Sequence, residues 1–280
     1  MRTSVIHDPL SGAPRTISRL TFGGSRVGSL GNPATPEETR ALMRAALDLG
    51  VNIFDTADIY GQGDSEREIG RILKGRRDEA FVVTKFGKMF SPAMRVMRPF
   101  KPILKPLLAA RGAARAVTAR RDGVMREDFS PARLRGALEA SLRRLGFEHV
   151  DALLLHSPPE LVYGDPDVAD LLRALQVEGK VRHFGASCET WRDVEAALDI
   201  QGLTFLQVPY DLVARMATDP TARRLTERKV VIMAREVIRL QPALSPPAAV
   251  AAAAAQDVIT TVVAGTGRLD HLAELAQIFG

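Results

Sequence analysis

The chain contains few of the residues that form disulfide bonds or bind metal ions. Only one cysteine, Cys188, occurs in 280 residues, which excludes an intramolecular disulfide framework and is compatible with a reducing compartment. The five histidines show no metal-ligand spacing, so we expect no metal site. With 46% hydrophobic and 25% charged residues, the composition is that of an ordinary globular protein rather than a disordered or fibrous one.

Long hydrophobic runs are also absent. No stretch approaches the roughly 18 apolar residues of a membrane-spanning helix, and the nearest, residues 248–255, is short and rich in alanine. The first ten residues, MRTSVIHDPL, contain neither an apolar run nor a small-residue cleavage pattern, so we expect no secretory signal. We therefore predict a soluble, cytoplasmic protein.

Acidic residues are scarce in only one part of the chain. The whole sequence carries 38 lysines and arginines against 33 acids, a formal net charge of +5. Ten of those cations and a single acid, Asp122, fall between Lys88 and Arg126, so the rest of the chain is slightly acidic. The basic character, which in a whole protein points to a polyanionic partner, therefore belongs to one segment.

What the sequence does contain is a regular alternation of short apolar runs and helical stretches. Eight runs rich in Val, Ile, Leu and Phe predict strands at 20–22, 51–54, 81–84, 150–155, 181–185, 203–208, 230–233 and 259–263. Helices are predicted at 36–49, 65–73, 130–145, 167–178, 189–198, 220–227, 246–256 and 268–278. Eight such units predict an α/β fold, a (β/α)8 TIM barrel, in one domain over residues 1–280. A doubly wound sheet is disfavoured, because the loop GGSRVG after the first strand does not spell G-x-G-x-x-G.

Two of the helix starts carry capping patterns. Thr35 precedes Pro36 and is predicted to be an N-cap, with proline at the first helical position. The run from Ser65 to Glu68 resembles a capping box.

One connection is much longer than the others. Residues 87–128 separate the third strand from the third helix, and we predict an inserted basic loop within the barrel domain. Its role stays open among a lid, a clamp for an anionic substrate or cofactor phosphate, and an attachment to a membrane surface or nucleic acid. We expect no nucleic-acid partner, because the segment has too few aromatic residues for base stacking.

Four complementary side chains are predicted at one end of the barrel, since catalytic groups in such barrels lie at the C-terminal ends of strands. They are Asp55 after the second strand, Tyr60 in the loop that follows, Lys85 at the end of the third strand and His156 at the end of the fourth. A lysine cation lowers the pKa of a neighbouring tyrosine from its ordinary value near 10, and a carboxylate offsets the cost of burying that lysine. His156 can hydrogen-bond a substrate oxygen. None of the four donates a hydride, so carbonyl chemistry here requires a nicotinamide.

These segments resemble the aldo-keto reductase family, and the resemblance runs from Leu20 to Phe279. The stretch FDTADIYGQGDSEREIG at 54–70 is similar to the family's segment around its catalytic aspartate and tyrosine. VVTKFG at 82–87 is similar to its lysine strand, and LGFEHVDALLLH at 145–156 to its histidine strand. The resemblance implies a (β/α)8 barrel, NADP(H) or alternatively NAD(H) as cofactor, and a catalytic tetrad of Asp55, Tyr60, Lys85 and His156.

The second half of the chain resembles the family's cofactor-binding segments. HFGASC at 183–188 implies that Ser187 holds the nicotinamide carboxamide, with Cys188 in place of the usual asparagine. FLQVPYD at 205–211 implies Gln207 as an amide ligand, and MARE at 233–236 implies Arg235 in place of a stacked aromatic ring, although Arg235 can also be a salt-bridge partner of Glu236.

VVAGTGRLDHLAEL at 262–275 resembles the segment that binds the cofactor phosphates, and glycines before a helix suit an anion at its N-terminus. Arg268 is the first candidate for a 2′-phosphate, which would favour NADP, and His271 the second. The cofactor-binding residues implied in all are Gly24, Ser25, Asp55, Ser187, Cys188, Gln207, Arg235, Gly265, Thr266, Gly267, Arg268 and His271.

We therefore expect an NADP(H)-dependent oxidoreductase that reduces an aldehyde or ketone, including sugars, with the proton coming from Tyr60. The tetrad is reversible, so an NAD(P)-dependent aldose or alcohol dehydrogenase stays open. A cofactor-sensing, non-catalytic accessory protein also stays open, although the complete tetrad argues against it. Because the connection at 237–245 is short, we expect the insertion at 87–128 to form a wall of the substrate pocket.

Overall fold

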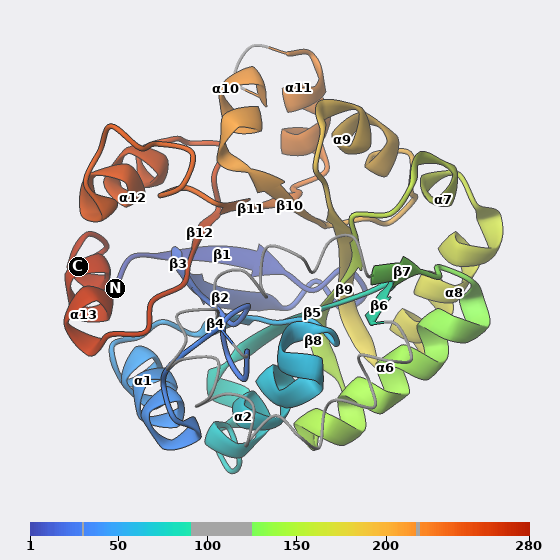
Figure 1. Cartoon of the computed structure of the whole chain (residues 1–280). Helices are drawn as coiled ribbons and strands as arrows, with labels where there is room; N and C mark the ends of the chain where they lie inside the picture. Colours follow the sequence, from blue (N-terminus) through green and yellow to red (C-terminus); the bar gives the residue numbers. More distant parts are fainter. Residues whose placement is uncertain (30, 91–124, 217–218) are drawn as a thin grey trace.

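The computed structural model describes residues 1–29, 31–90, 125–216 and 219–280. Eight parallel strands form a closed barrel, seen end-on in Figure 1. In barrel order they are β3 (Leu20–Gly23), β4 (Ile53–Asp55), β5 (Phe81–Phe86), β8 (Val150–His156), β9 (Val181–Ser187), β10 (Phe205–Pro209), β11 (Val231–Arg235) and β12 (Thr261–Ala264), which pairs with β3. All eight predicted strands are confirmed, and with them the TIM barrel.

The eight predicted helices are also present and surround the barrel (Figure 1). They are α1 (Pro36–Asp48), α2 (Asp64–Ile72), α6 (Pro131–Leu145), α8 (Pro166–Val177), α9 (Trp191–Ala197), α11 (Thr221–Glu227), α12 (Pro246–Ala254) and α13 (Leu269–Gln277). Short helical turns occupy several loops: η1 (Tyr60–Gly63), η2 (Arg77–Glu79), α7 (Glu160–Tyr163), η5 (Tyr210–Leu212) and α10 (Val213–Met216). One side of each long helix packs against the outside of the barrel, where its apolar side chains are buried.

The two capping predictions have different outcomes. Thr35 caps α1 as expected, in a capping box in which its hydroxyl accepts from the Glu38 N–H at 3.1 Å. The capping box predicted at Ser65 is wrong, because α2 begins one residue earlier, after Gly63 in a left-handed conformation. The Ser65 hydroxyl lies inside the fold instead, where it accepts from Thr56 and donates to the Gly24 carbonyl.

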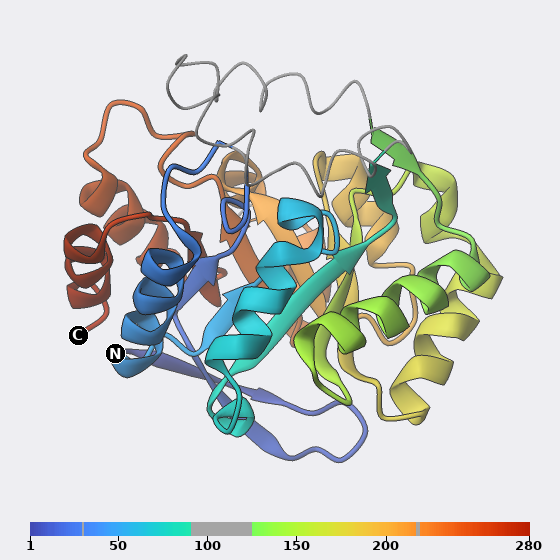
Figure 2. The same ribbon diagram turned by 60° about the horizontal axis from the view of Figure 1, so that its bottom comes forward.

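An antiparallel hairpin of β1 (Thr3–His7) and β2 (Pro14–Ser18) closes the end of the barrel at which the strands begin (Figure 2). The hairpin is held there partly by Asn52, whose side-chain oxygen accepts from the Ser18 N–H at 2.7 Å. Ile6 and Ile17 join the barrel's interior core, whose other members are Ile53, Phe81, Val83, Ala152, Leu154, Phe205, Val231 and Met233. The hairpin therefore closes this end of the barrel with apolar side chains. The sequence patterns did not predict this hairpin.

A second hairpin, β6 (Lys88–Phe90) with β7 (Met125–Glu127), lies at the base of the predicted insertion. The Asp128 N–H donates to the Gly87 carbonyl at 2.8 Å, so the two ends of the segment 87–128 lie together just beyond β5. Residues 91–124 lie outside the described residues, and the predicted roles of the basic loop stay predictions. No helix in the described part of the chain is both long enough and apolar enough to cross a membrane.

Candidate active site

A buried ion pair stands where β4 and β5 end. The Lys85 ammonium donates to Asp55 Oδ1 at 2.6 Å and to the Thr56 carbonyl at 2.9 Å. Both side chains are buried, and that of Lys85 has no exposed surface at all. A buried charge is tolerated only when it is paired and hydrogen-bonded, and these two contacts meet that condition. The third proton of the ammonium remains for another neighbour.

That neighbour is Tyr60, at the start of η1. The Lys85 ammonium lies 4.9 Å from the centre of the tyrosine ring, and the His156 ring meets the tyrosine edge-on at 6.0 Å between centroids. The turn that returns the chain to this point needs Gly61 at φ +56°, where an added Cβ would lie 2.6 Å from the Val27 carbonyl. The four side chains predicted as a tetrad are thus brought together.

Burial sets the ionisation of the tyrosine and lysine. Removal from water raises the pKa of Tyr60 above its ordinary value, and the opposing effect of the Lys85 cation is smaller. Burial alone would lower the pKa of Lys85, but Asp55 and Tyr60 favour the cation and the pKa of Lys85 is raised. The expectation that lysine lowers the tyrosine pKa is therefore outweighed by burial, and at neutral pH Tyr60 is a protonated donor beside a cation.

His156 is the neutral member of the group. Burial, followed by the cations Lys85, Lys88 and Arg235, lowers the pKa of this imidazole well below its ordinary value. Its Nδ1 atom is buried and has no hydrogen-bond partner among the residues that the structure describes. A neutral imidazole with an unused ring nitrogen can fix a substrate oxygen without carrying charge into the site.

A cavity of about 650 Å³ opens above these groups at the C-terminal end of the barrel. Besides Asp55, Tyr60 and His156, its walls contain five of the residues that the sequence assigned to the cofactor: Ser25, Ser187, Gln207, Arg235 and Gly265. They also contain charged residues that the sequence did not assign to the site: Arg26, Glu189, Glu236 and Arg239. Each lies in the loop that follows a barrel strand, so the strand-end rule, applied to every strand, would have found them.

Ser187 and Gln207 form a polar pair in the cavity wall. The Ser187 hydroxyl donates to Gln207 Oε1 at 3.2 Å. Gln207 is only 2% exposed, and its Nε2 finds no acceptor in the described part of the chain. A buried amide N–H without an acceptor is costly, so the site favours a ligand that brings one, and a carboxamide oxygen fits. The residues present therefore suit a nicotinamide.

Arg235 ties two loops together at the rim of the cavity. Its guanidinium donates to the Cys188 carbonyl at 2.9 Å and pairs with Glu189 at 2.6 Å. It also pairs with Glu236, so the salt bridge left open by the sequence is present. The Ser157 hydroxyl donates to the same Glu189 at 2.7 Å, which extends this bridge to the loop after β8.

The Cys188 side chain lies away from the cavity. It is buried, with its sulfur 4.0 Å from the Tyr163 hydroxyl, and burial raises the pKa of the thiol. Successive side chains of an extended segment point to opposite sides, so Ser187 facing inward leaves Cys188 facing outward. Cys188 therefore borders the site through its carbonyl, and its protonated thiol is a poor nucleophile.

The predicted phosphate segment divides between two hollows. Arg26 and Gly265 line both the main cavity and a smaller hollow beside the start of α1, whereas Thr266 and Gly267 line only the smaller hollow. Arg268 is exposed at the N-cap of α13 and pairs with Asp270, its Nε lying 3.0 Å from Oδ1.

His271, in the first turn of α13, is exposed and stands outside both hollows as the structure describes them. Gly24 is buried below the cavity wall, where its N–H donates to the Asp55 carbonyl at 2.7 Å. A Cβ at this position would lie 2.8 Å from the same carbonyl oxygen, so only glycine fits. Across the described ranges, no three histidine, cysteine, aspartate or glutamate side chains gather closely enough to hold a metal ion.

Comparison with known proteins agrees with this class of barrel. The family profile described as "Aldo/keto reductase family" matches residues 19–241. The chain therefore belongs to the aldo/keto reductase family.

Among curated relatives, a 6-dehydroglucose reductase of Agrobacterium fabrum (strain C58) is 33% identical over 174 residues, which is 61% of this chain and 50% of the relative. A D-threo-aldose 1-dehydrogenase of a Pseudomonas species is 32% identical over 176 residues, 60% of this chain and 49% of the relative. The chain thus spans about half the length of these relatives. Among solved structures, a Klebsiella pneumoniae aldo/keto reductase in complex with NADP and acetate has a TM-score of 0.69 at 18% identity. That alignment covers 100% of this chain and 90% of the other, and it shows the shared fold.

Proposed function

We propose that the protein is an NADP(H)-dependent oxidoreductase that reduces an aldehyde or ketone to an alcohol. The observation that carries the proposal is the buried Asp55–Lys85 pair against a protonated Tyr60, beside a neutral His156, at the floor of one cavity. This arrangement places a proton donor, a group that stabilises the resulting anion and a hydrogen-bonding imidazole around one point.

When bound, a nicotinamide cofactor supplies the hydride that the protein's own side chains lack. We assign its carboxamide to Ser187 and Gln207, and its phosphates to the region of Arg26, Gly265 and the N-terminus of α13.

The protein's own contribution is to the proton. His156 orients the substrate oxygen by a hydrogen bond, and the Tyr60 hydroxyl gives its proton to that oxygen. Lys85, fixed by Asp55, stabilises the phenolate that remains. In the opposite direction the same phenolate accepts the proton of an alcohol, so the arrangement also serves an NAD(P)-dependent aldose or alcohol dehydrogenase.

The relatives' names guide the substrate class. They describe a reductase of 6-dehydroglucose and a dehydrogenase of D-threo-aldoses, so we propose a sugar or another small polar carbonyl compound here. Two cations near the phosphate region, Arg26 and Arg268, support NADP(H) over NAD(H). A cytoplasmic location is proposed on composition, since the single cysteine is buried as a thiol and suits a reducing compartment.

Titration with NADPH and NADH, followed by a panel of carbonyls and aldoses, tests this function. We expect tighter binding of NADPH and turnover of at least one aldehyde or aldose. Tight NADH binding with weak NADPH binding would contradict the assignment of Arg26 and Arg268. Tight binding of either cofactor without turnover of any compound, in either direction, would contradict the enzymatic function and support a cofactor-sensing, non-catalytic accessory protein.

A further inference from the structure

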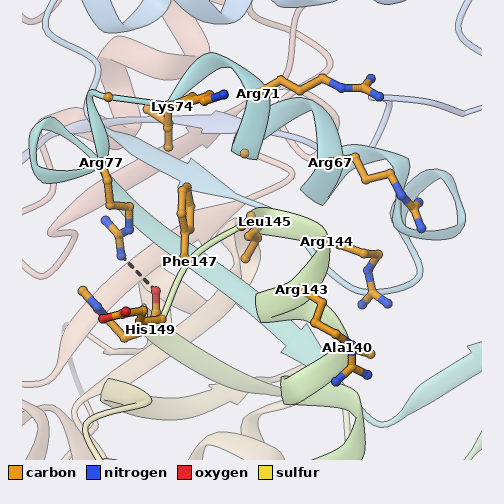
Figure 3. Close-up of a pocket in the computed structure, with 15 residues that line it drawn as sticks. Arg67, Arg71, Lys74, Arg77, Ala140, Arg143, Arg144, Leu145, Phe147 and His149 are labelled. Carbon is orange, nitrogen blue, oxygen red and sulfur yellow. Dashed lines mark hydrogen bonds between the residues drawn. The ribbon is translucent and has the colours of Figure 1, made fainter.

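A second and larger cavity lies on the outside of the barrel, between α2 and α6. It has a volume of about 980 Å³, and Figure 3 shows side chains rising into it from both helices and from the turns that follow them. Arg77 precedes β5 and His149 precedes β8, so the cavity lies toward the strand starts. The candidate active site lies at the strand ends, and the two cavities share no lining residue.

The shape of the cavity is set by close packing at its base. Gly70 of α2 touches the end of α6 so closely that a Cβ there would lie 2.1 Å from the Leu145 carbonyl oxygen. Phe147, just after α6, forms part of the floor, and the Arg77 guanidinium stacks on its ring at 4.8 Å. The two helices meet at the base and leave a hollow above it, lined by apolar surface below and charge at the rim.

The charge is almost entirely of one sign. Six cationic side chains line the cavity: Arg67, Arg71, Lys74, Arg77, Arg143 and Arg144. The single acid in the lining is Glu148. The first four cations come from α2 and the segment after it, and the other two from the end of α6, so both helices contribute cations to the lining (Figure 3).

Four of the six cations are already paired with an acid: Arg67 with Asp64 at 3.1 Å, Arg71 with Glu68, and Arg77 and Arg144 with acids buried behind the cavity wall. Arg77 pairs with the buried Asp151 at 2.6 Å, and Arg144 pairs with the buried Glu66 at 2.5 Å. These acids are 1% and 0% exposed and lie outside the lining of the cavity. A guanidinium has five N–H donors in a planar fork. Arg144 also donates to Ser141 and keeps further donors for a ligand, whereas Arg77 also donates to the Ala80 and His149 carbonyls and is largely occupied.

Two of the cations have no such anchor. Lys74 and Arg143 are exposed and have no acidic partner in the described part of the chain. Cations near the end of a helix are favoured by its dipole, which accounts for Arg143 in the last turn of α6. Salt bridges account for four of the six cations, and among the described residues no acid balances the charge of Lys74 and Arg143, which stand on two different helical segments of the same cavity.

We propose that this cavity binds a small polyanion that carries two or three linked phosphate groups. Arginine forks match phosphate oxygens in pairs, and a chain of phosphates is the compact anion that can meet cations from both helical segments at once. The volume lies at the upper end of the range for small-molecule sites, and the concave form favours a small ligand over the broad surface that a nucleic-acid duplex needs. Free polyphosphate and the phosphate chain of a nucleotide share this chemistry.

Calorimetric titration with inorganic tripolyphosphate tests the proposal. The titration is done on the full chain with saturating NADP⁺, so that the cofactor cavity cannot take up the probe. We expect one site per chain, weakened about fivefold by Lys74→Ala and about fivefold by Arg143→Ala, as expected for partly exposed charge pairs. Arg192 is an exposed cation on α9, far from this cavity. Arg192→Ala is therefore the matched control and should leave the affinity unchanged.

Three results would overturn the proposal. They are no binding in the presence of NADP⁺, equal affinity in all variants, or a stronger and steeply salt-dependent binding of single-stranded DNA that covers many phosphates per chain. A parallel titration with ATP separates the two sources of the ligand. Affinity equal to that of tripolyphosphate means that the cavity binds phosphates alone, and a higher affinity means that it also binds the nucleoside.

Discussion

The two ends of the barrel are built on opposite principles. At the closed end, Ile6 and Ile17 of the hairpin fill an interior of apolar side chains. At the open end, Lys85 and Asp55 are buried as charges, and Gln207 Nε2 and His156 Nδ1 are buried without partners among the described residues. The apolar plug at the closed end therefore needs no ligand, whereas the open end is complete only when a ligand supplies the missing partners.

Stability and function therefore depend on opposite ends of the barrel. Apolar burial at the closed end contributes to folding and does not depend on any ligand. The polar groups of the open end reduce stability unless they are paired, and such groups cluster where binding and proton transfer occur. Substitutions at the closed end should therefore change mainly stability, and substitutions at the open end mainly activity or cofactor binding. Four variants test this comparison.

The largest effect is expected from Lys85→Met. Removing the cation deprives the Tyr60 phenolate of its stabilising neighbour, so we expect carbonyl reduction to fall by about 10³-fold or more. Asp55 would be left buried without its partner, which costs about 3–5 kcal/mol of stability. Steady-state kinetics and urea unfolding measure the two effects. Activity within tenfold of the wild type would contradict the role given to Lys85.

Ile17→Ala tests the closed end. The side chain is fully buried in the interior core, and its truncation should lower the free energy of unfolding by about 2–4 kcal/mol. The turnover number and KM should stay within twofold of the wild type when measured well below the melting temperature. A large change in turnover at unchanged stability would show that the two ends are not separate.

His183 gives the closed end a dependence on pH. Burial against Phe81 and Phe205 lowers the pKa of this imidazole to about 4, whereas in the unfolded chain it lies near 6.5. Between these values the unfolded state binds the proton and the folded state does not, so stability should fall as the pH drops from 6.5 to 4. The loss attributed to His183 is about 1–3 kcal/mol.

His183→Gln removes this group and retains a polar side chain. Chemical denaturation at pH 7, 5.5 and 4.5 should show a smaller loss of stability in the variant than in the wild type. Parallel losses in the two proteins would assign the acid sensitivity to other groups.

Gln207→Ala is expected to have the smallest effect. Loss of one amide donor to the carboxamide should weaken NADPH binding by about tenfold, in line with the removal of one hydrogen bond in a buried site. The melting temperature without cofactor should fall by only about 2–4 °C, because the variant loses the hydrogen bond from Ser187 to Oε1, whereas the deleted Nε2 has no partner among the described residues. Fluorescence titration and thermal unfolding provide the measurements, and unchanged NADPH affinity would remove Gln207 from the cofactor site.

Much of this architecture could be predicted from the sequence, because each feature leaves a local signal. Buried parallel strands appear as apolar runs, and the strand-end rule then locates Asp55, Lys85 and His156. The hairpin of residues 3–18 was missed because its strands are short and half exposed, with only Ile6 and Ile17 pointing into the barrel.

Other features depend on packing that no local pattern records. The raised pKa of Tyr60 follows from burial, which outweighs the neighbouring lysine that the sequence does reveal. The outward position of Cys188 depends on which side of the extended segment faces the barrel. The cavity between α2 and α6 is lined by residues from 67–77 and from 140–149. Only the pairing of the two helices brings those two basic stretches together.

The most direct test of the account is Tyr60→Phe, which removes a single oxygen and preserves the ring beside Lys85 and His156. NADPH binding is measured by fluorescence titration, and reduction of the best carbonyl substrate by single-turnover kinetics on the same preparation. We predict NADPH affinity within about twofold of the wild type and a loss of reduction of about 10³-fold or more. Reduction near the wild-type rate, with cofactor bound, would contradict the claim that Tyr60 supplies the proton.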